Sequence, residues 1–149
     1  MPNYDFKKDF PISQETELEV AELLITKGAE VISFNNDNKY DILIKYKGKE
    51  AKVEVKEDFT CKKTGNIGVE FSCRGKPSGI SVSEADFYIY KAHEPTNEIH
   101  FYMMKTKNLK KLIKNKLYKR IVNGGDRYSN SLNYLFDLEY IKQISILLK

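Results

Sequence analysis

The sequence predicts a mixed α/β domain, in which a central mixed β-sheet is flanked by helices. Two observations favour this class. Helical patterns occur near both ends of the chain, and strand patterns lie between them. The chain has 149 residues, of which 41% are hydrophobic and 31% are charged. This length and composition are typical of one compact globular domain, and we expect it to span residues 1–149.

The first expected helix begins after Ser13, whose hydroxyl can cap it, and ends at Gly28. Pro11 stands before it, which also favours a helix start in this region. Its apolar stripe consists of Leu18, Val20, Ala21, Leu24 and Ile25.

Strand patterns follow this helix. They occur in VISF (31–34), YDILIKY (40–46), AKVEVKE (51–57), DFYIYKA (86–92) and IHFYMMK (99–105). A turn at residues 47–50 is expected to join the second and third segments as a hairpin. A further hairpin-like unit is expected to turn near residues 63–66 into IGVEFSC (67–73), and the glycines and proline of residues 74–79 predict a loop.

The last third of the chain has helical patterns. Thr106 can cap a basic helix that is expected from about Lys107 to Arg120, and residues 123–126 (NGGD) end it. Its expected core positions are Leu109, Leu112, Ile113 and Leu117. The tail DLEYIKQISILL (137–148) is expected to form a last helix, although its β-branched residues are also compatible with a strand.

Charge is unevenly distributed along the chain. The net charge is +4, but no Asp or Glu occurs from Ile99 through Gly125. The basic residues of this stretch are Lys105, Lys107, Lys110, Lys111, Lys114, Lys116, Lys119 and Arg120. Such asymmetry indicates a polyanionic partner, nucleic acid before a membrane. A solvated helix face is the simpler alternative.

Other classes are disfavoured. No apolar run is long enough to span a bilayer, and the first ten residues lack the apolar core of a signal peptide. We therefore expect a cytoplasmic protein, in the host cytoplasm if the chain is encoded by a phage or virus. The cysteines are twelve residues apart and the histidines seven, and neither spacing matches a zinc site. A disulfide between the cysteines across a hairpin is an alternative that a reducing compartment disfavours.

Glu17 is a candidate functional residue because it falls in the middle of the apolar stripe of the first helix. A buried carboxylate without a partner costs roughly several kcal/mol, or it must take up a proton. We therefore expect a polar or cationic partner, or a cleft that reaches this face. An exposed helix end is the alternative.

The hairpin of residues 40–57 holds a second group of candidates. A two-residue loop at residues 48–49 would place Asp41 opposite Lys56, with Glu54 nearby on the same face of the sheet. The other face is apolar and consists of Ile42, Ile44, Val53 and Val55. Two neighbouring carboxylates repel each other unless a cation joins them, and Mg²⁺ prefers such oxygen ligands. Lys56 could orient an attacking water or offset transition-state charge. A surface ladder of opposite charges is the simpler alternative.

The pattern of Asp41 followed by Glu54-Val55-Lys56 resembles the core motif of the PD-(D/E)XK, or restriction-endonuclease-like, nuclease superfamily. Residues 39–40 (KY) stand in place of the usual Pro before the Asp. The layout of helix, Asp and Glu-x-Lys is similar to that of archaeal Holliday-junction resolvases. The chain length and the segment GKPSGISVSEADFYIY resemble small phage-type nucleases of the same superfamily. The resemblance covers roughly residues 14–91.

This resemblance implies a restriction-endonuclease-like mixed sheet of about four or five strands with a helix on each face. It implies that Asp41, Glu54 and the backbone carbonyl of Val55 bind Mg²⁺ or Mn²⁺, and that Lys56 acts on the attacking water. Glu17 would be an outer ligand or would orient a water. The implied reaction cuts a phosphodiester bond and leaves a 5′-phosphate. Glu70, in the next strand, is considered as a further acidic ligand.

The implied substrate is DNA, and two basic segments are expected to hold it. One is the loop of residues 74–79 with Arg74, Lys76 and Ser78, and the other is the basic helix. The lysines that lie along about one side of this helix are Lys107, Lys110, Lys111 and Lys114. An enzyme for branched DNA would need two sites and hence a homodimer. A restriction-type endonuclease, an RNA-directed nuclease and an inactive DNA-binding module with a nuclease-like fold are the alternatives.

Overall fold

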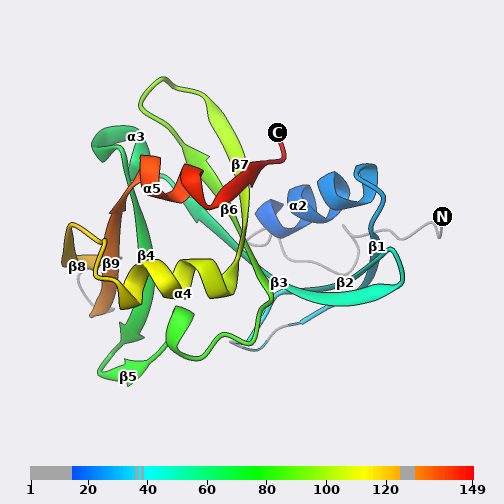
Figure 1. Cartoon of the computed structure of the whole chain (residues 1–149), viewed down its shortest axis with the longest axis horizontal. Coiled ribbons are helices and arrows are strands. Elements are labelled where there is room, and N and C mark those ends of the chain that lie inside the picture. Colours follow the sequence, from blue (N-terminus) through cyan, green and yellow to red (C-terminus); the bar gives the residue numbers. More distant parts are fainter. Residues whose placement is uncertain (1–14, 36, 38, 125–129) are drawn as a thin grey trace.

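The computed structural model of the chain describes residues 15–35, 37, 39–124 and 130–149. Two sheets are present in this part of the chain (Figure 1). The six-stranded sheet has the order β1 (Glu30–Phe34), β2 (Ile42–Tyr46), β3 (Lys49–Asp58), β6 (Phe87–His93), β7 (Ile99–Lys105) and β10 (Ser145–Leu147). The four-stranded sheet has the order β5 (Lys76–Pro77), β4 (Asn66–Cys73), β9 (Ser131–Asp137) and β8 (Arg120–Gly124).

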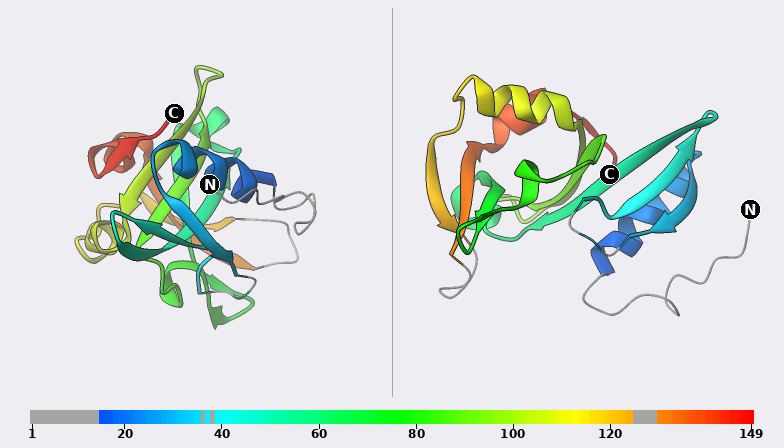
Figure 2. Two further views of the ribbon diagram at one scale, coloured as in Figure 1. Left: turned by 90° about the vertical axis from the view of Figure 1, so that its right-hand side faces the viewer. Right: turned by 90° about the horizontal axis from the view of Figure 1, so that it is seen from below.

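The six-stranded sheet is mixed, because β3 and β6 are parallel whereas its other neighbouring strands are antiparallel. Helix α2 (Glu15–Thr26) lies on one face of it. Helices α4 (Thr106–Lys114) and α5 (Leu138–Gln143) and the second sheet lie on the other face (Figure 2). The predicted α/β class, a mixed sheet flanked by helices, is confirmed.

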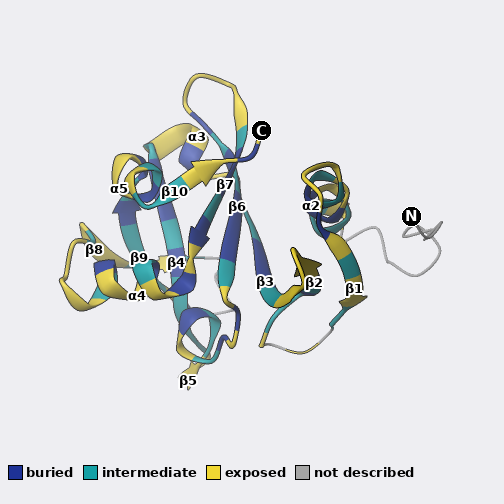
Figure 3. Ribbon diagram, turned by 45° about the vertical axis from the view of Figure 1, so that its right-hand side comes forward, coloured by how far each residue is buried: buried dark blue, intermediate teal, exposed yellow. Residues whose placement is uncertain are grey.

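Each face of the six-stranded sheet has its own hydrophobic cluster. On one face, α2 packs against β2 and β3. The fully buried members from these elements include Val20, Ala21, Ile42 and Val53. On the other face, tyrosines of β6 pack against β4, β9, α4 and α5. Buried residues therefore alternate between the two faces of β6, which is buried over most of its length (Figure 3).

Helix α2 ends as expected. Gly28 has a φ of +101°, and its N–H donates to the carbonyl of Ile25 at 3.0 Å. Glycine adopts this conformation without a steric penalty, so it ends the helix. The predicted cap Ser13 and the preceding Pro11 lie outside the described residues.

The second sheet is a correction to the prediction. The segment 67–73 forms a strand, but it pairs with β9 and β5 and not with β3, so the hairpin-like unit near residues 63–66 is wrong. A short helix, α3 (Cys61–Thr64), separates β3 from β4. The chain at residues 74–79 is also more regular than a loop. Arg74 and Gly75, both with positive φ, form the turn of a β4–β5 hairpin.

The basic helix is shorter than predicted. It ends at Lys114, because Lys116 has a φ of +55° and the N–H of Lys119 donates to the carbonyl of Leu135 as the chain enters β8. Leu117 is consequently 38% exposed and does not belong to the core. Thr106 is the first helical residue, not the cap, and no side-chain cap hydrogen bond is formed at Lys105.

The tail combines both secondary structures that its sequence allows. Helix α5 begins after Asp137, whose carboxylate accepts from the N–H of Glu139 at 3.0 Å. The chain then forms β10, which pairs with β7. Cys61 and Cys73 are not joined by a disulfide. Within the part of the chain that the structure describes, no helix has the length and apolar character needed to cross a membrane.

Gly79 provides a test of this packing. Its φ is +52°, and a Cβ built on it would lie 2.2 Å from the backbone oxygen of Glu70. We expect Gly79→Ala to lower the free energy of unfolding by about 2–4 kcal/mol, through strain and a backbone clash. The matched control is Gly75→Ala, because Gly75 also has positive φ but meets open space. It should cost only about 1 kcal/mol. Equal losses in urea denaturation would contradict the described contact between residues 70 and 79.

Candidate active site

The site lies on an edge of β3 that has no neighbouring strand in the described part of the chain. The pairing of β2 with β3 ends at Ile42 and Val53, whereas β3 continues to Asp58. Beyond this point Asp41 takes the place of a strand. Its N–H donates to the carbonyl of Val53 at 2.9 Å, and its carboxylate accepts from the N–H of Val55 at 2.7 Å. The Asp41 side chain is therefore fixed by the backbone of β3.

The register of the β2–β3 hairpin differs from the predicted register by two residues. The turn consists of Lys47 and Gly48, which have φ values of 50° and 81°, and so Tyr46 pairs with Lys49. Continued past Val53, this register places Asp41 opposite Glu54 and not opposite Lys56. A shift of two residues keeps every side chain on its face. The two carboxylates are consequently direct cross-strand neighbours, about 5 Å apart at Cβ.

Glu54 is the buried member of the pair. It is 8% exposed and lies beside Tyr88 in the parallel register of β3 and β6. Its Oε2 lies 3.7 Å from the Lys56 Nζ, and the Lys56 side chain is 38% exposed. Burial raises the pKa of Glu54, a hydrogen bond with the Asp41 carboxyl raises it further, and the charge of Lys56 opposes both. Without a cation, Glu54 therefore favours its protonated, neutral form.

Glu17 joins this group from the first turn of α2. Its Oε2 is buried and has no hydrogen-bond partner among the described residues. Burial raises the pKa of Glu17 to about 7, the charge of Asp41 raises it as well, and Lys56 opposes them. The neighbouring Thr16 donates its hydroxyl to Glu57 at 2.5 Å, which holds this end of the helix beside β3.

The residues present fit a hard divalent cation of the magnesium type, which needs only one or two carboxylates from the protein. A larger metal site is not formed, because no set of three or more His, Cys, Asp and Glu side chains within the described ranges is arranged to hold a metal ion. Asp41 and Glu54 offer two carboxylates, and the Val55 carbonyl points to the same edge as its N–H. Mg²⁺ is commonly held by one or two carboxylates and keeps several waters. Burial and the neighbouring carboxyl groups raise the pKa of Glu54, and the Glu17 Oε2 has no partner among the described residues, so a cation at this edge would favour the charged forms of both groups.

A cleft of about 350 Å³ borders the site, between β3 and the second sheet. Lys56 lines it on one side and Glu70 on the other. The Glu70 carboxylate accepts from the hydroxyl of Ser131 at 2.6 Å, and the side-chain amide of Asn133 donates to the same hydroxyl at 3.1 Å. Sequence reasoning missed Ser131 and Asn133, because only the pairing of β4 with β9 brings them to Glu70.

The predicted DNA-binding residues are not gathered at this site. Arg74 and Lys76 are exposed on the β4–β5 hairpin, in the second sheet. The Ser78 hydroxyl is buried and has no hydrogen-bond partner among the described residues. The lysines of α4 are Lys107, Lys110, Lys111 and Lys114, all of them exposed. No ion pair or hydrogen bond within the described ranges joins any of these residues to the acidic group.

Comparisons with known proteins give one structural similarity. No family model matches the chain, and no curated protein matches it. Among solved structures, the chain is similar to a bacterial homing endonuclease, I-Ssp6803I, with 21% sequence identity and a TM-score of 0.43. The alignment covers 70% of this chain and 71% of that chain. A likeness at this level assigns neither a family nor a function.

The raised pKa of Glu17 predicts how stability depends on pH. Because its folded-state pKa of about 7 exceeds the ordinary value of 4.5, its contribution is present below the ordinary value and is lost as the pH rises through about 7. In EDTA at about pH 8.5, Glu17→Gln should therefore raise the free energy of unfolding by about 1–2 kcal/mol, after allowance for partial exposure. Near pH 4 the gain should vanish.

The matched control is Glu22→Gln, on the exposed side of the same helix. Urea denaturation of both variants at the two pH values provides the measurement. Stability changes that are the same for the two variants would show that Glu17 is solvated in the folded protein.

Proposed function

We propose that the chain is a divalent-metal-dependent deoxyribonuclease of the PD-(D/E)XK type, which hydrolyses phosphodiester bonds. The observation that supports this most is the position of Asp41. Its carboxylate is fixed by the N–H of Val55, directly opposite Glu54. Lys56 is two residues further along the same face, 3.7 Å from the Glu54 carboxylate. These are the four positions of the Asp and Glu-x-Lys motif, arranged around one strand edge.

Asp41, Glu54 and the Val55 carbonyl would hold Mg²⁺ or Mn²⁺. A bound divalent ion would supply positive charge at a phosphoryl oxygen, which stabilises the transition state of phosphodiester hydrolysis. The protein contributes the rigidity of the ligands, since Asp41 is tied to β3 through both its backbone and its side chain.

Lys56 would act on the attacking water. Its side chain is partly exposed at the border of the cleft, so its ammonium group can reach a phosphate that lies there. Glu17 would be an outer ligand or would orient the same water, because its Oε2 has no hydrogen-bond partner among the described residues. The water gives up a proton and its oxygen bonds to phosphorus, the bond from phosphorus to the 3′ oxygen breaks, and that oxygen takes up a proton from solvent water, so the products are a 5′-phosphate and a 3′-hydroxyl.

DNA is the proposed partner because residues 99–125 contain eight lysines and arginines and no acidic residue. The exposed Arg74, Lys76 and lysines of α4 would contribute affinity that falls with salt. Ser78 would add a polar contact. Cleavage of branched DNA would require a homodimer, in which each copy provides one site.

A cleavage assay tests the proposal. Wild-type protein should cut a labelled plasmid or a branched DNA junction with Mg²⁺ or Mn²⁺, but not with EDTA. Lys56→Ala and Glu54→Gln should each lower the cleavage rate by about 10²-fold or more and should retain DNA binding. The matched control is Lys52→Ala, since Lys52 is also on β3 and pairs with Glu84 at 3.7 Å. It should cut normally.

Two results would contradict the proposal. Equal cleavage by wild type and by Lys56→Ala would place the nuclease elsewhere. DNA binding without cleavage in either metal would identify the chain as an inactive DNA-binding module.

A further inference from the structure

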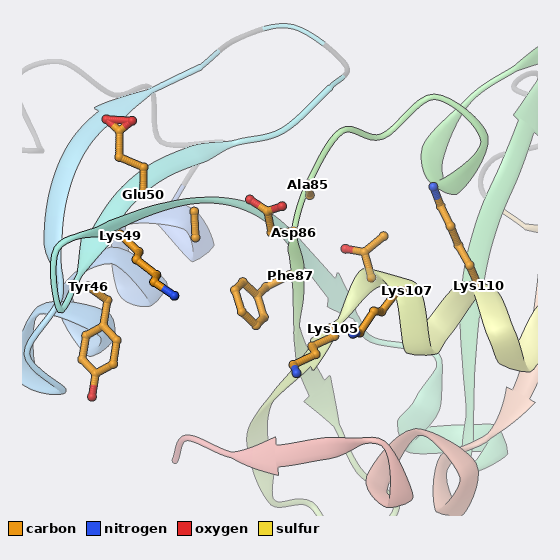
Figure 4. A pocket seen from close by; sticks show the side chains of 11 residues that line it. Tyr46, Lys49, Glu50, Ala85, Asp86, Phe87, Lys105, Lys107 and Lys110 are labelled. Carbon is orange, nitrogen blue, oxygen red and sulfur yellow. The ribbon is translucent and has the colours of Figure 1, made fainter.

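A second pocket lies at the end of the six-stranded sheet where β6 begins and β7 leads into α4, and residues of β2, β3, β6, β7 and α4 line it (Figure 4). Its volume is about 620 Å³, which is in the range of ligand-binding pockets. Its residues Phe87 of β6 and Ala51 of β3 pack on the α2 side of the sheet, whereas Glu54 points to the opposite side. No residue of the candidate active site lines the pocket. It is therefore a separate site.

Four lysines line this pocket, and none of them forms an ion pair with another described residue. They are Lys49, Lys105, Lys107 and Lys110. Two acidic residues, Glu50 and Asp86, also line the pocket. The Asp86 carboxylate already has a hydrogen-bond donor, because it accepts from the N–H of Lys52 at 2.8 Å. Figure 4 shows the Lys49 ammonium directed toward the Phe87 ring, while the carboxylates of Glu50 and Asp86 point the other way. The pocket therefore favours an anion.

An aromatic ring lies among these cations. Phe87 is half-buried, and its ring lies between Lys49 and Lys105 in Figure 4. Tyr46, which is exposed, lines the same pocket. Aromatic side chains beside positive charges are the combination that binds single-stranded nucleic acid, in which bases stack on the rings and phosphates contact the lysines.

We propose that this pocket binds an unpaired nucleotide of a DNA strand, with its base against Phe87 and its flanking phosphates against the four lysines. In a duplex the faces of each base are covered by its neighbours, so an intact duplex offers no base to the ring. The inference rests on the proposed function and specifies its substrate class as DNA with a single-stranded end or branch.

Binding is measured in EDTA, where cleavage does not interfere. The probes are a labelled oligothymidylate and a blunt duplex of the same length, compared by fluorescence anisotropy. Phe87→Leu should weaken binding of the single strand by about tenfold and leave duplex binding unchanged. Phe87→Tyr, which keeps the ring, should bind like wild type and controls for folding. Lys107→Gln should weaken single-strand binding and reduce its salt dependence by about one charge.

The matched controls are Tyr140→Leu and Lys63→Gln, which change an exposed aromatic residue on α5 and an exposed lysine on α3. Neither should alter single-strand binding. Equal single-strand binding by wild type and Phe87→Leu, or an equal loss on duplex and single strand, would overturn the inference.

The inference and the proposed function fail in different ways. If the chain is not a nuclease, no metal restores cleavage, but Phe87→Leu still weakens binding of the oligothymidylate. If the pocket does not bind unpaired DNA, plasmid cleavage remains dependent on Glu54 while Phe87→Leu binds the oligothymidylate like wild type. Cleavage can thus be tested with Glu54→Gln without disturbing the pocket.

Discussion

The candidate site depends on a difference in length between two paired strands. β3 continues for five residues past its last pairing with β2, and this leaves backbone groups that need partners. The carboxylate of Asp41 accepts the N–H of Val55 at 2.7 Å, so the requirement is met by a side chain and not by a strand. The same hydrogen bond holds Asp41 opposite Glu54. The hydrogen bond that satisfies the N–H of Val55 therefore also brings two carboxyl groups together.

Two carboxyl groups in this position are unfavourable unless a proton or a cation joins them. Burial and the neighbouring Asp41 raise the pKa of Glu54, and burial does the same to Glu17. The positive charge of Lys56 lowers both pKa values only in part, because its side chain is partly exposed and its charge is screened. The two hydrophobic clusters hold the surrounding elements in place, so the acidic group cannot relax by moving apart. Such a group is suited to bind a divalent ion.

Much of this arrangement could be predicted from the sequence. Alternation of apolar and polar residues located β2, β3, β6 and β7, and it placed Asp41, Glu54 and Lys56 on one face. The register was wrong by two because Lys47 adopts positive φ in the turn, a conformation that non-glycine residues rarely take. The shared face survived this error because side chains alternate with a period of two.

The second sheet could not be predicted in the same way. Asn133 interrupts the apolar pattern of β9, and Leu132 on the same strand is exposed, so the segment lacks regular alternation. Residues 120–124 form β8 only because β9 is beside them, and alone they read as the end of a basic helix followed by a turn. The cleft with Glu70 depends on this sheet, and so it too is a product of tertiary structure.

The central claim is that one divalent ion binds between Asp41 and Glu54. Crystals soaked with Mn²⁺ test it most directly, because manganese gives an anomalous signal that locates the ion. The account predicts one peak within about 2.5 Å of carboxylate oxygens of both residues and near the Val55 carbonyl. A peak elsewhere, or an ordered Asp41 and Glu54 with no peak between them at saturating Mn²⁺, would contradict it.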